Sequence, residues 1–545
     1  MLSESPEYVV ALLSSSAYSY KVAEIDLRQT HISYVHIAGD YVFKTKKAVD
    51  FGFINQMSIE SRKNFCEQEV RLNSRLAPSI YLGVVPVVQL SGGQIIVDPM
   101  PDMSVEGDIL EWAVKMRRLP EDATLASILE AGSRNLDTLA ERLAIRLVEF
   151  HKTCEEVEPD IEFAGPKKVK EWWDRELTEV IGFIDSTLPA KTYACLLTSV
   201  ERMLQAYESV LLQRLETGRV VEGHGDLHCD HIYFLPALSE LASGRSDGIV
   251  IVDGIEFNDW FQFRYLDVGY ELAFLAMDMT ARGYESLADE IVGRYIIATG
   301  DETLGVLQPL YRMFRAFIRG KIASITAQDL ALSEDIRQKS EIEASRYFAL
   351  AVGYVPDLSQ TVAVVMCGVS GSGKSLISAT LASKHGYAWL NSDAIRKEMF
   401  GVAVDDELSP SKYSDDISQQ VYEKMLEKAQ LFISLGQSVV LDATHLTRAQ
   451  RLNSMTVAIQ SGASSTLVAI DIDAEMANDR LISRMNKAGN ISDATSNVLK
   501  KQLGLYQTPS ADEVSHGIVI DANLELAEQI SLISDHIDFI NQSIE

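Results

Sequence analysis

The sequence predicts a multidomain protein that joins an α+β part to an α/β part built on a doubly wound parallel sheet. Its 545 residues exceed what one hydrophobic core usually serves. After residue 361, apolar runs of strand length alternate with helical periodicity, which is typical of a parallel sheet covered on both faces. The segment VGYVPDLSQ, residues 352–360, interrupts the helical pattern just before that alternation. We therefore predict two domains, residues 1–355 and 356–545.

The composition disfavours several classes of protein. A net charge of −29 repels phosphate backbones, which argues against non-specific nucleic-acid binding but leaves a nucleic-acid acceptor at the C-terminal domain open. Five scattered cysteines without a CxxC pair indicate free thiols in a reducing compartment. The first residues lack the pattern of a signal peptide, and no apolar run approaches the ~20 residues that span a bilayer. We expect a cytoplasmic protein with no membrane partner and leave its oligomeric state open.

The N-terminal domain is predicted to begin with a helical lead-in over residues 1–30, followed by a hairpin. Residues 31–47, HISYVHIAGDYVFKTKK, place two alternating runs around Gly39 and Asp40, a strong hairpin signal. Lys44 and Lys46 share one face of the second strand because side chains alternate with period two. Residues 65–78 have helical spacing with Glu69 in the middle, and the next strands are expected at 81–90, 94–100 and 110–120.

The rest of this domain is predicted to be mainly helical. Residues 121–222 are mostly amphipathic, and we interpret Trp172 and Trp173 as core residues, not as a ligand cage. Strand patterning returns at 220–234 and 248–257, and helices then continue to about residue 354.

Two carboxylates follow neighbouring strands in this region. Asp226 lies in HGDLHCDH, residues 224–231, and Asp253 lies in VIVDGIEF, residues 250–257. A phosphotransferase uses such a pair, one carboxylate to orient the acceptor hydroxyl and another to bind Mg²⁺ on the phosphates. The strand lysine and Glu69 would supply the ion pair that anchors phosphates in that chemistry.

The histidines of HGDLHCDH suggest an alternative. The spacing of His224, His228 and His231 allows a zinc cluster, but the sequence offers no thiolate or carboxylate set that completes it. We therefore favour the phosphotransferase interpretation.

A phosphate-binding loop is predicted at residues 362–375, VAVVMCGVSGSGKS. It follows the GxxxxGK[ST] pattern between an apolar strand and a helix, so a chance Gly/Ser-rich turn is the less favoured alternative. Glycines let backbone N–H groups turn inward around a phosphate, and the helix N-terminus adds positive charge. We expect Lys374 to reach the β and γ phosphates of ATP and Ser375 to hold Mg²⁺. The nucleotide-binding candidates are Gly368, Ser370, Gly371, Ser372, Gly373, Lys374 and Ser375.

Candidate substrate residues follow the later strands. Asp393 ends the strand AWLNSD, before a helix expected from Ala394, where it can accept a hydroxyl proton or, alternatively, cap the helix. Arg396 lies one turn further on and can clamp an anionic substrate. The segment LDATHLTRAQR adds three substrate-binding candidates at the next strand end, namely Asp442, Thr444 and Arg448.

Two arginines on one later helix complete the C-terminal candidates. Arg480 and Arg484 are four residues apart, so they face the same way. They can stabilise charge on a transferred phosphoryl group, or they can belong to a solvated face with ion pairs.

Residues 30–350 resemble the aminoglycoside phosphotransferase and choline kinase group. The features that carry this resemblance are the hairpin lysine, Glu69, the HGD motif and the later aspartate. This resemblance implies a protein-kinase-like fold, with an N-lobe over about residues 30–118 and a C-lobe over about 119–350. It implies Asp226 as catalytic base, Asp253 as metal ligand, and Lys44, with Lys46 as runner-up, paired to Glu69. The 110–120 strand would then be the hinge that receives adenine near Met116, and His224 would brace the catalytic loop.

One position departs from that family. Its HGDxxxxN pattern ends in an asparagine that helps hold metal, and this chain has His231 there. Mg²⁺ prefers hard oxygen ligands. The N-terminal domain is therefore expected to use one metal, use another ion, or lack kinase activity.

Residues 360–530 resemble predicted P-loop kinases related to polynucleotide 5′-kinases and zeta-type toxins. The matching segments are SDAIR, DATHLTRAQR and the two helix arginines. The resemblance implies Asp393 as general base and Arg480 and Arg484 as lid arginines. The whole chain resembles bacterial fusions of a phosphotransferase-like domain with such a kinase.

These expectations combine into an ATP-dependent phosphotransferase. The C-terminal domain would transfer the γ-phosphate to a hydroxyl of a small-molecule or nucleotide-type acceptor, and the acidic net charge favours a small molecule. The N-terminal domain would be a second phosphotransferase. One alternative is a nucleotide-binding regulator whose N-terminal domain is a degenerate sensor or scaffold; another is a polynucleotide 5′-kinase or zeta-like toxin.

Overall fold

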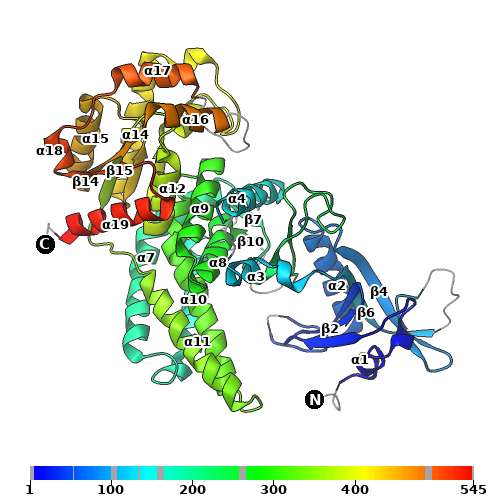
Figure 1. The fold of residues 1–545 in the computed structure, drawn as a ribbon. Helices are drawn as coiled ribbons and strands as arrows, with labels where there is room; N and C mark the ends of the chain where they lie inside the picture. The colour runs from blue at the N-terminus through cyan, green and yellow to red at the C-terminus, as the bar shows by residue number, and fades with distance from the viewer. Residues whose placement is uncertain are drawn as a thin grey trace. The chain divides into compact units, whose positions relative to one another are not determined.

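The computed structural model describes residues 5–52, 54–99, 107–132, 136–155, 165–256, 265–484 and 494–542. The chain forms two compact units (Figure 1). Unit 1 comprises residues 1–134, 153–157 and 220–266, and unit 2 comprises residues 135–152, 158–219 and 267–545. Unit 2 thus groups helices from before residue 355 with the C-terminal sheet, and the domain boundary between residues 355 and 356 stays a prediction.

Unit 1 contains a six-stranded antiparallel sheet in the order β1-β2-β3-β6-β4-β5. Its strands are β1 (Ile25–Gln29), β2 (Ser33–Ala38), β3 (Tyr41–Lys46), β4 (Tyr81–Leu90), β5 (Ile95–Val97) and β6 (Gly107–Arg117). The predicted hairpin is confirmed, with Ala38 paired to Tyr41 across the turn. The helical lead-in is only partly correct, because α1 (Glu7–Ala11) is short and β1 was not predicted.

A longer helix packs against this sheet. It is α2 (Ile59–Asn73), the helix predicted around Glu69, and it packs against β4 and β6. Its N-cap is Ser58, whose hydroxyl oxygen accepts the N–H of Ser61 at 3.0 Å. Glu69 and Asn73, one turn apart, are both buried polar residues.

The second part of unit 1 carries the HGDLHCDH segment. Its elements are α3 (Leu125–Glu130), β7 (Val220–Glu222), β8 (Ile232–Phe234), β9 (Ile249–Ile251) and β10 (Tyr265–Asp267), which continues into unit 2. The antiparallel strands β8 and β9 pair Tyr233 with Val250. Asp226 and His231 therefore lie in the connection before β8, and Asp253 lies just after β9.

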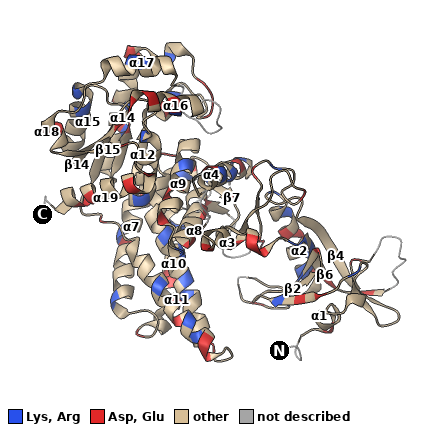
Figure 2. Cartoon of the chain, in the orientation of Figure 1, with Lys and Arg blue, Asp and Glu red and all other residues tan. Residues whose placement is uncertain are grey.

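Unit 2 contains a long-helix layer, as the sequence predicts. Its helices are α4 (Leu136–Thr153), α6 (Pro166–Glu179), α7 (Ala190–Glu216), α8 (Val268–Ala281), α9 (Glu285–Thr299), α10 (Leu304–Gln328) and α11 (Glu334–Gly353). The core role of Trp172 and Trp173 is confirmed, since they are 5% and 0% exposed. Acidic and basic residues are interspersed along α10 and α11 (Figure 2).

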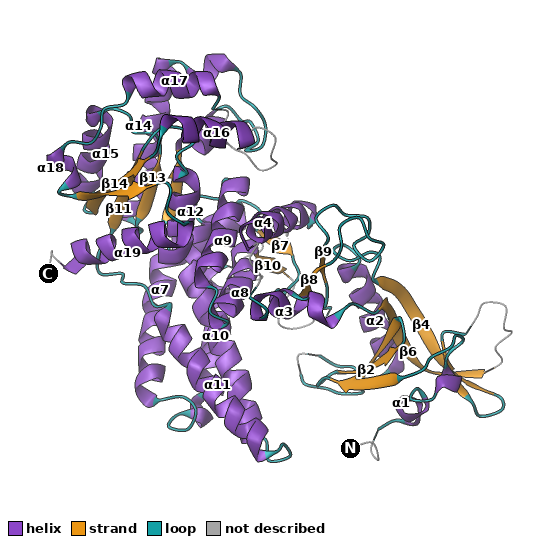
Figure 3. Cartoon of the chain, in the orientation of Figure 1, coloured by secondary structure: helices purple, strands orange, loops and turns teal. Residues whose placement is uncertain are grey.

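The C-terminal part of unit 2 is the predicted parallel sheet, in the order β12-β13-β11-β14-β15. Its strands are β11 (Val362–Cys367), β12 (Ala388–Asn391), β13 (Val439–Asp442), β14 (Ser464–Asp471) and β15 (Gly517–Asp521). Helices flank it (Figure 3). They are α12 (Lys374–His385), α13 (Ser392–Met399), α14 (Asp415–Ser434), α15 (Arg448–Gln460), α16 (Ala474–Arg484), α17 (Ser496–Leu505), α18 (Ala511–Val514) and α19 (Leu526–Gln542). The doubly wound fold is confirmed.

Helix α12, which begins at Lys374, packs directly on α9 and α10. A Cβ added to Gly293 of α9 would stand 2.8 Å from the main-chain nitrogen of Thr380, so glycine allows this close approach. The buried Arg312 of α10 donates to Asp289 Oδ1 at 2.7 Å and to Ser383 Oγ of α12 at 2.8 Å. The helix behind the phosphate loop is therefore held by elements from before residue 355.

No helix in the described part of the chain is both long enough and apolar enough to cross a membrane.

Candidate active sites

The predicted phosphate loop lies between β11 and α12, the strand–loop–helix order that the sequence indicates. Gly368, Gly371 and Gly373 have φ values of 147°, 85° and 96°, which side chains with a Cβ rarely adopt. Lys374 folds back over the loop, where its Nζ donates to the Val369 carbonyl at 2.8 Å and contacts Ser372 Oγ at 3.3 Å. The lysine is thus within the loop, next to the turns that would surround a phosphate.

Helix α16 rests on this loop. A Cβ added to Gly371 would lie 2.3 Å from the Ala477 carbonyl oxygen, so the two backbones touch. Arg480 donates to the Ser372 carbonyl at 3.4 Å and to the Ala522 carbonyl at 2.7 Å, which places one predicted lid arginine at the loop. Arg484 ends the same helix, and its side chain lies outside the part that the structure describes.

Helix α17 supplies a loop contact that the sequence did not indicate. Gln502 Oε1 accepts the main-chain N–H of Ser370 at 2.7 Å. Gln502 is more than 130 residues from Ser370 and belongs to no phosphate-binding motif. Only the tertiary packing of α17 reveals it.

At the neighbouring strand end, Asn391 is the cap of α13. Its Oδ1 accepts the main-chain N–H groups of Asp393 and Ala394, both at 2.9 Å. The helix therefore begins at Ser392, not at Ala394, and the alternative of Asp393 as the cap is wrong. Asp393 instead occupies the first turn, where the partial positive charge of the helix N-terminus favours a carboxylate.

The same asparagine links two sheet strands. Asn391 pairs with Asp442 in the β12–β13 register, and its Nδ2 donates to Asp442 Oδ2 at 2.6 Å. Asp442 is 2% exposed. The structure therefore brings Asp393 and Asp442, through Asn391, to one edge of the sheet that also carries the phosphate loop.

The other substrate-binding candidates have protein partners. Arg396, 6% exposed, lies 4.6 Å over the Tyr413 ring and donates to the Lys412 carbonyl at 3.1 Å. Arg448 pairs with Asp512 at 2.6 Å on the surface, and Thr444 Oγ1 lies 3.4 Å from the Tyr422 hydroxyl. Their substrate roles stay predictions.

A cavity of about 290 Å³ within unit 2 lies beside Asn391. Lys428 lines it and pairs with Glu302 at 2.8 Å and Glu398 at 2.7 Å, which line it as well. The charges of its wall are thus partly neutralised by one another.

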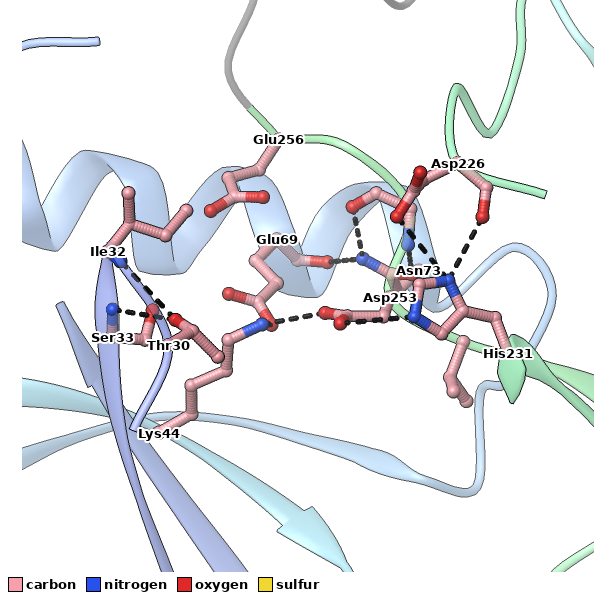
Figure 4. A network of polar contacts seen from close by, with 12 residues as sticks. Thr30, Ile32, Ser33, Lys44, Glu69, Asn73, Asp226, His231, Asp253 and Glu256 are labelled. Carbon is pink, nitrogen blue, oxygen red and sulfur yellow. Dashed lines mark hydrogen bonds and ion pairs between the residues drawn. The ribbon is translucent and has the colours of Figure 1, made fainter. Parts of the chain in front are cut away.

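In unit 1, two lysines converge on Glu69 (Figure 4). Lys44 Nζ lies 2.9 Å from Glu69 Oε1 and 2.6 Å from Asp253 Oδ1. Lys46 Nζ lies 2.5 Å from Glu69 Oε2 and also pairs with Glu256. Both lysines that the sequence proposed as partners of Glu69 thus contact it. Within the described residues, the hydrogen bond to Asp253 comes from Lys44 and not from Lys46.

The opposite charges in this network stabilise each other's ionised forms. Desolvation opposes the charged form of Lys44, but Asp253 and Glu69 outweigh it and raise the pKa of Lys44 well above its usual range. Desolvation likewise opposes ionised Asp253, and Lys44, followed by His231, holds the pKa of that carboxyl far below its usual range. Lys44 and Asp253 are therefore a charged pair at neutral pH.

His231 lies between the two predicted catalytic carboxylates. Its Nδ1 donates to the main-chain carbonyl of Asp226 at 2.9 Å, and its Nε2 lies 3.6 Å from Asp253 Oδ2. His224 Nε2 contacts the Val252 carbonyl at 3.0 Å, which fits the predicted bracing role. Ligand atoms of Asp226, His228 and His231 lie within 4.8 Å of one another. Two of the three histidines of the zinc alternative thus meet a carboxylate, and among the described residues His224 does not belong to this group.

Two residues that the sequence analysis missed anchor Asp253. Asn73 accepts the N–H of Gly254 at 2.7 Å and donates to the Glu69 carbonyl at 2.9 Å. The Tyr81 hydroxyl accepts the N–H of Asp253 at 3.0 Å. They hold Asp253 at a φ of 64°, which is uncommon for residues other than glycine.

The predicted adenine contact, Met116, lies near the end of β6, where it pairs with Val42 and Tyr81. A cavity of about 420 Å³ lies along the segment that follows. Its wall includes Arg117, Arg118 and Leu119. The contact of Met116 with adenine stays a prediction.

Comparison with known proteins agrees with the C-terminal resemblance. Residues 364–509 match the family model described as AAA domain. Uncharacterized protein Rv2004c of Mycobacterium tuberculosis and Uncharacterized protein Mb2027c of Mycobacterium bovis are each 28% identical to this chain over 481 residues, which cover 87% of this chain and 88% of theirs.

Solved structures resemble separate parts of the chain. A gluconokinase from Sinorhizobium meliloti 1021 is 22% identical and covers 33% of this chain and 94% of its own, with a TM-score of 0.26. The GDP complex of aminoglycoside 2′-phosphotransferase-IIIa is 14% identical and covers 61% of this chain and 94% of its own, with a TM-score of 0.36.

Proposed function

We propose that the C-terminal part of unit 2 is an ATP-dependent kinase that transfers the γ-phosphate to a hydroxyl of a small-molecule or nucleotide-type acceptor. The observation that carries this proposal is the arrangement of one sheet edge. The loop with Lys374 follows β11, and Asp393 and Asp442 follow the paired strands β12 and β13. Ligands of open parallel sheets bind at this edge.

The loop side chains suit a nucleotide triphosphate. Lys374 Nζ donates to the Val369 carbonyl and contacts Ser372 Oγ, so its ammonium group already lies within the loop that would surround the phosphates. Ser375 lies in the first turn of α12 and offers a hydroxyl oxygen, a ligand type that suits Mg²⁺. The bound ion would neutralise charge on the β and γ phosphates.

The acceptor side would use Asp393 and Arg480. Asp393, held at the N-terminus of α13 by the Asn391 cap, would accept the proton of the attacking hydroxyl. Arg480 already contacts the loop and would stabilise charge on the transferred group. A pure nucleotide switch needs neither group, which favours the enzyme over the regulator.

The test is to measure ATP binding and transfer of labelled γ-phosphate by the full chain, against pools of sugars, nucleosides, small alcohols and nucleic-acid 5′ ends. The full chain is needed because α12 packs on α9 and α10. Lys374→Ala should abolish turnover and weaken ATP binding. Unchanged affinity together with unchanged turnover in this variant would contradict the proposal.

For unit 1 we propose a second nucleotide site, with Lys44 anchoring phosphates and Asp226 near the acceptor. The Lys44–Glu69 pair supports this, because it is the ion pair that kinase chemistry uses. The Lys44–Asp253 bond and His231 favour the alternative of a sensor without transfer activity. Binding of ATP to the Lys374→Ala chain, and its loss in a Lys44→Ala, Lys374→Ala double variant, would support the site.

A further inference from the structure

The residues at Asp253 do not fit the Mg²⁺ that the family resemblance implies. Mg²⁺ takes oxygen ligands in near-octahedral geometry. Position 231, where the resemblance expects the oxygen of an asparagine, presents an imidazole nitrogen 3.6 Å from Asp253 Oδ2. Imidazole suits zinc and other first-row transition ions instead.

The orientation of His231 is that of a metal ligand. A carbonyl oxygen only accepts, so the 2.9 Å bond to the Asp226 carbonyl requires the proton on Nδ1. In the neutral ring, the lone pair is then on Nε2, the nitrogen that faces Asp253. Metal-bound histidines are commonly fixed in this way, with the other ring N–H donated to a carbonyl or carboxylate.

Asp253 is held independently in the complementary orientation. Lys44 occupies its Oδ1, Tyr81 accepts its main-chain N–H, and its Oδ2 is the oxygen closest to His231. A lone pair that faces a carboxylate oxygen is unfavourable, and either a proton on Nε2 or a cation between the two atoms relieves the contact. The 3.6 Å separation exceeds the about 2.7–3.2 Å of an N–H···O hydrogen bond, which favours the cation.

The separation of the two atoms indicates the class of ion. Ligand atoms around a tetrahedral ion with bonds of about 2.0–2.2 Å lie about 3.3–3.6 Å apart. Around octahedral Mg²⁺, with bonds of about 2.1 Å, neighbouring ligands lie about 3.0 Å apart. The 3.6 Å between His231 Nε2 and Asp253 Oδ2 matches the tetrahedral ion.

We propose that unit 1 binds a divalent transition-metal ion such as Zn²⁺ or Co²⁺ between His231 Nε2 and Asp253 Oδ2, and that His231 makes this site prefer such an ion to Mg²⁺. Water or phosphate oxygens would complete the coordination of the ion. The proposal does not depend on phosphoryl transfer by the C-terminal domain.

A competing set lies on the other side of the ring, where Asp226 and His228 approach His231. The closest approach between the Asp226 carboxylate and His231 is 3.6 Å, through Nδ1. That nitrogen already donates to the Asp226 carbonyl. An ion on that side would have to break this bond, so we assign the site to Asp253.

The experiment titrates the full chain with Co²⁺ in the absence of nucleotide and follows visible absorption, with Zn²⁺ and Mg²⁺ as competitors. We expect one saturable Co²⁺ site per chain that Zn²⁺ displaces and excess Mg²⁺ does not. His231→Asn and Asp253→Asn should each weaken Co²⁺ binding on the order of tenfold or more. His31→Asn, an exposed histidine of the same unit, and His228→Asn should leave it unchanged.

Three results would overturn the proposal. They are no saturable Co²⁺ binding by the parent chain, equal displacement by Mg²⁺, and loss of binding in His228→Asn with retention in Asp253→Asn. Because Asp253→Asn also removes a partner of Lys44, circular dichroism and urea unfolding are compared for every variant. His231→Asn leaves the Lys44–Asp253 contact in place and is therefore the decisive variant.

Discussion

Asn391 and Asp442 meet at 2.6 Å across the ends of the paired strands β12 and β13, and the same asparagine caps the helix that carries Asp393. One side chain thus fixes the positions of two carboxylates at the candidate acceptor site. Its amide nitrogen serves Asp442, and its oxygen serves the two N–H groups at the start of α13.

We predict that Asn391→Ala destabilises the full chain by about 1–2 kcal/mol, because it removes the cap of α13. It also removes a hydrogen bond to the buried Asp442 carboxylate. Urea unfolding monitored by circular dichroism provides the measurement. Asn391→Ser is the control, since serine can cap α13 but does not replace the amide bond to Asp442. Equal stability of Asn391→Ala and the parent chain would contradict the cap.

We predict that Gln502→Ala strengthens ATP binding by about two- to tenfold. Its side-chain oxygen occupies the Ser370 N–H, and replacing one neutral hydrogen bond is worth about 0.5–1.5 kcal/mol. A phosphate oxygen would compete for the same donor. Equilibrium titration of the full chain with ATP is the measurement, and weaker binding by the variant would show that Gln502 supports the nucleotide instead of competing with it.

Close packing of α9 on α12 should be sensitive to a single methyl group. Gly293→Ala would place a Cβ 2.8 Å from Thr380 N and should destabilise the chain by about 1–3 kcal/mol. It should also weaken ATP binding, because α12 begins at Lys374. Gly353→Ala, at the end of α11 with no atom within 4 Å of its added Cβ, is the matched control. Identical unfolding curves for both variants would contradict this packing.

Acid should destabilise unit 2 through buried histidines. Burial lowers the pKa of His445 from its usual 6.5 to about 4, and burial likewise lowers that of His385 to about 4. Both therefore fold as neutral rings, so their contribution to stability is present above pH 6.5 and is lost as the pH falls toward 4. The free energy of unfolding, measured from pH 7 to pH 4, should fall over this range. Histidine NMR titration gives the control, and an unshifted midpoint for His445 would contradict its neutral buried state.

The sequence predicted those elements whose structure depends on residues close together in the chain. The hairpin at Gly39 and Asp40 and the loop before Lys374 were found because turn residues, flanking strand runs and a following helix all agree within a few residues. Strand β1 was missed because its sequence, IDLRQ, is mostly polar and its side chains are exposed or half-buried, so it lacks a clear apolar alternation.

The site details that the sequence did not predict depend on backbone geometry or on long-range contacts. Asn391, Ser392 and Asp393 are all good cap residues, and only the strand end shows that Asn391 takes this role. Asn73 and Tyr81 support Asp253 from other elements, far away in the sequence. No spacing rule connects such residues before the chain is folded.

The most direct test of the account is single-turnover phosphoryl transfer by Asp393→Asn, measured beside equilibrium ATP binding, with the acceptor that the labelled-phosphate screen identifies. Asparagine keeps the size of the side chain, and Asn391 still caps the helix, so stability and ATP affinity should stay near those of the parent chain. Loss of a general base should slow transfer on the order of 10²–10⁴-fold. Transfer at the parent rate by this variant would show that Asp393 is not the base and would contradict the proposed mechanism.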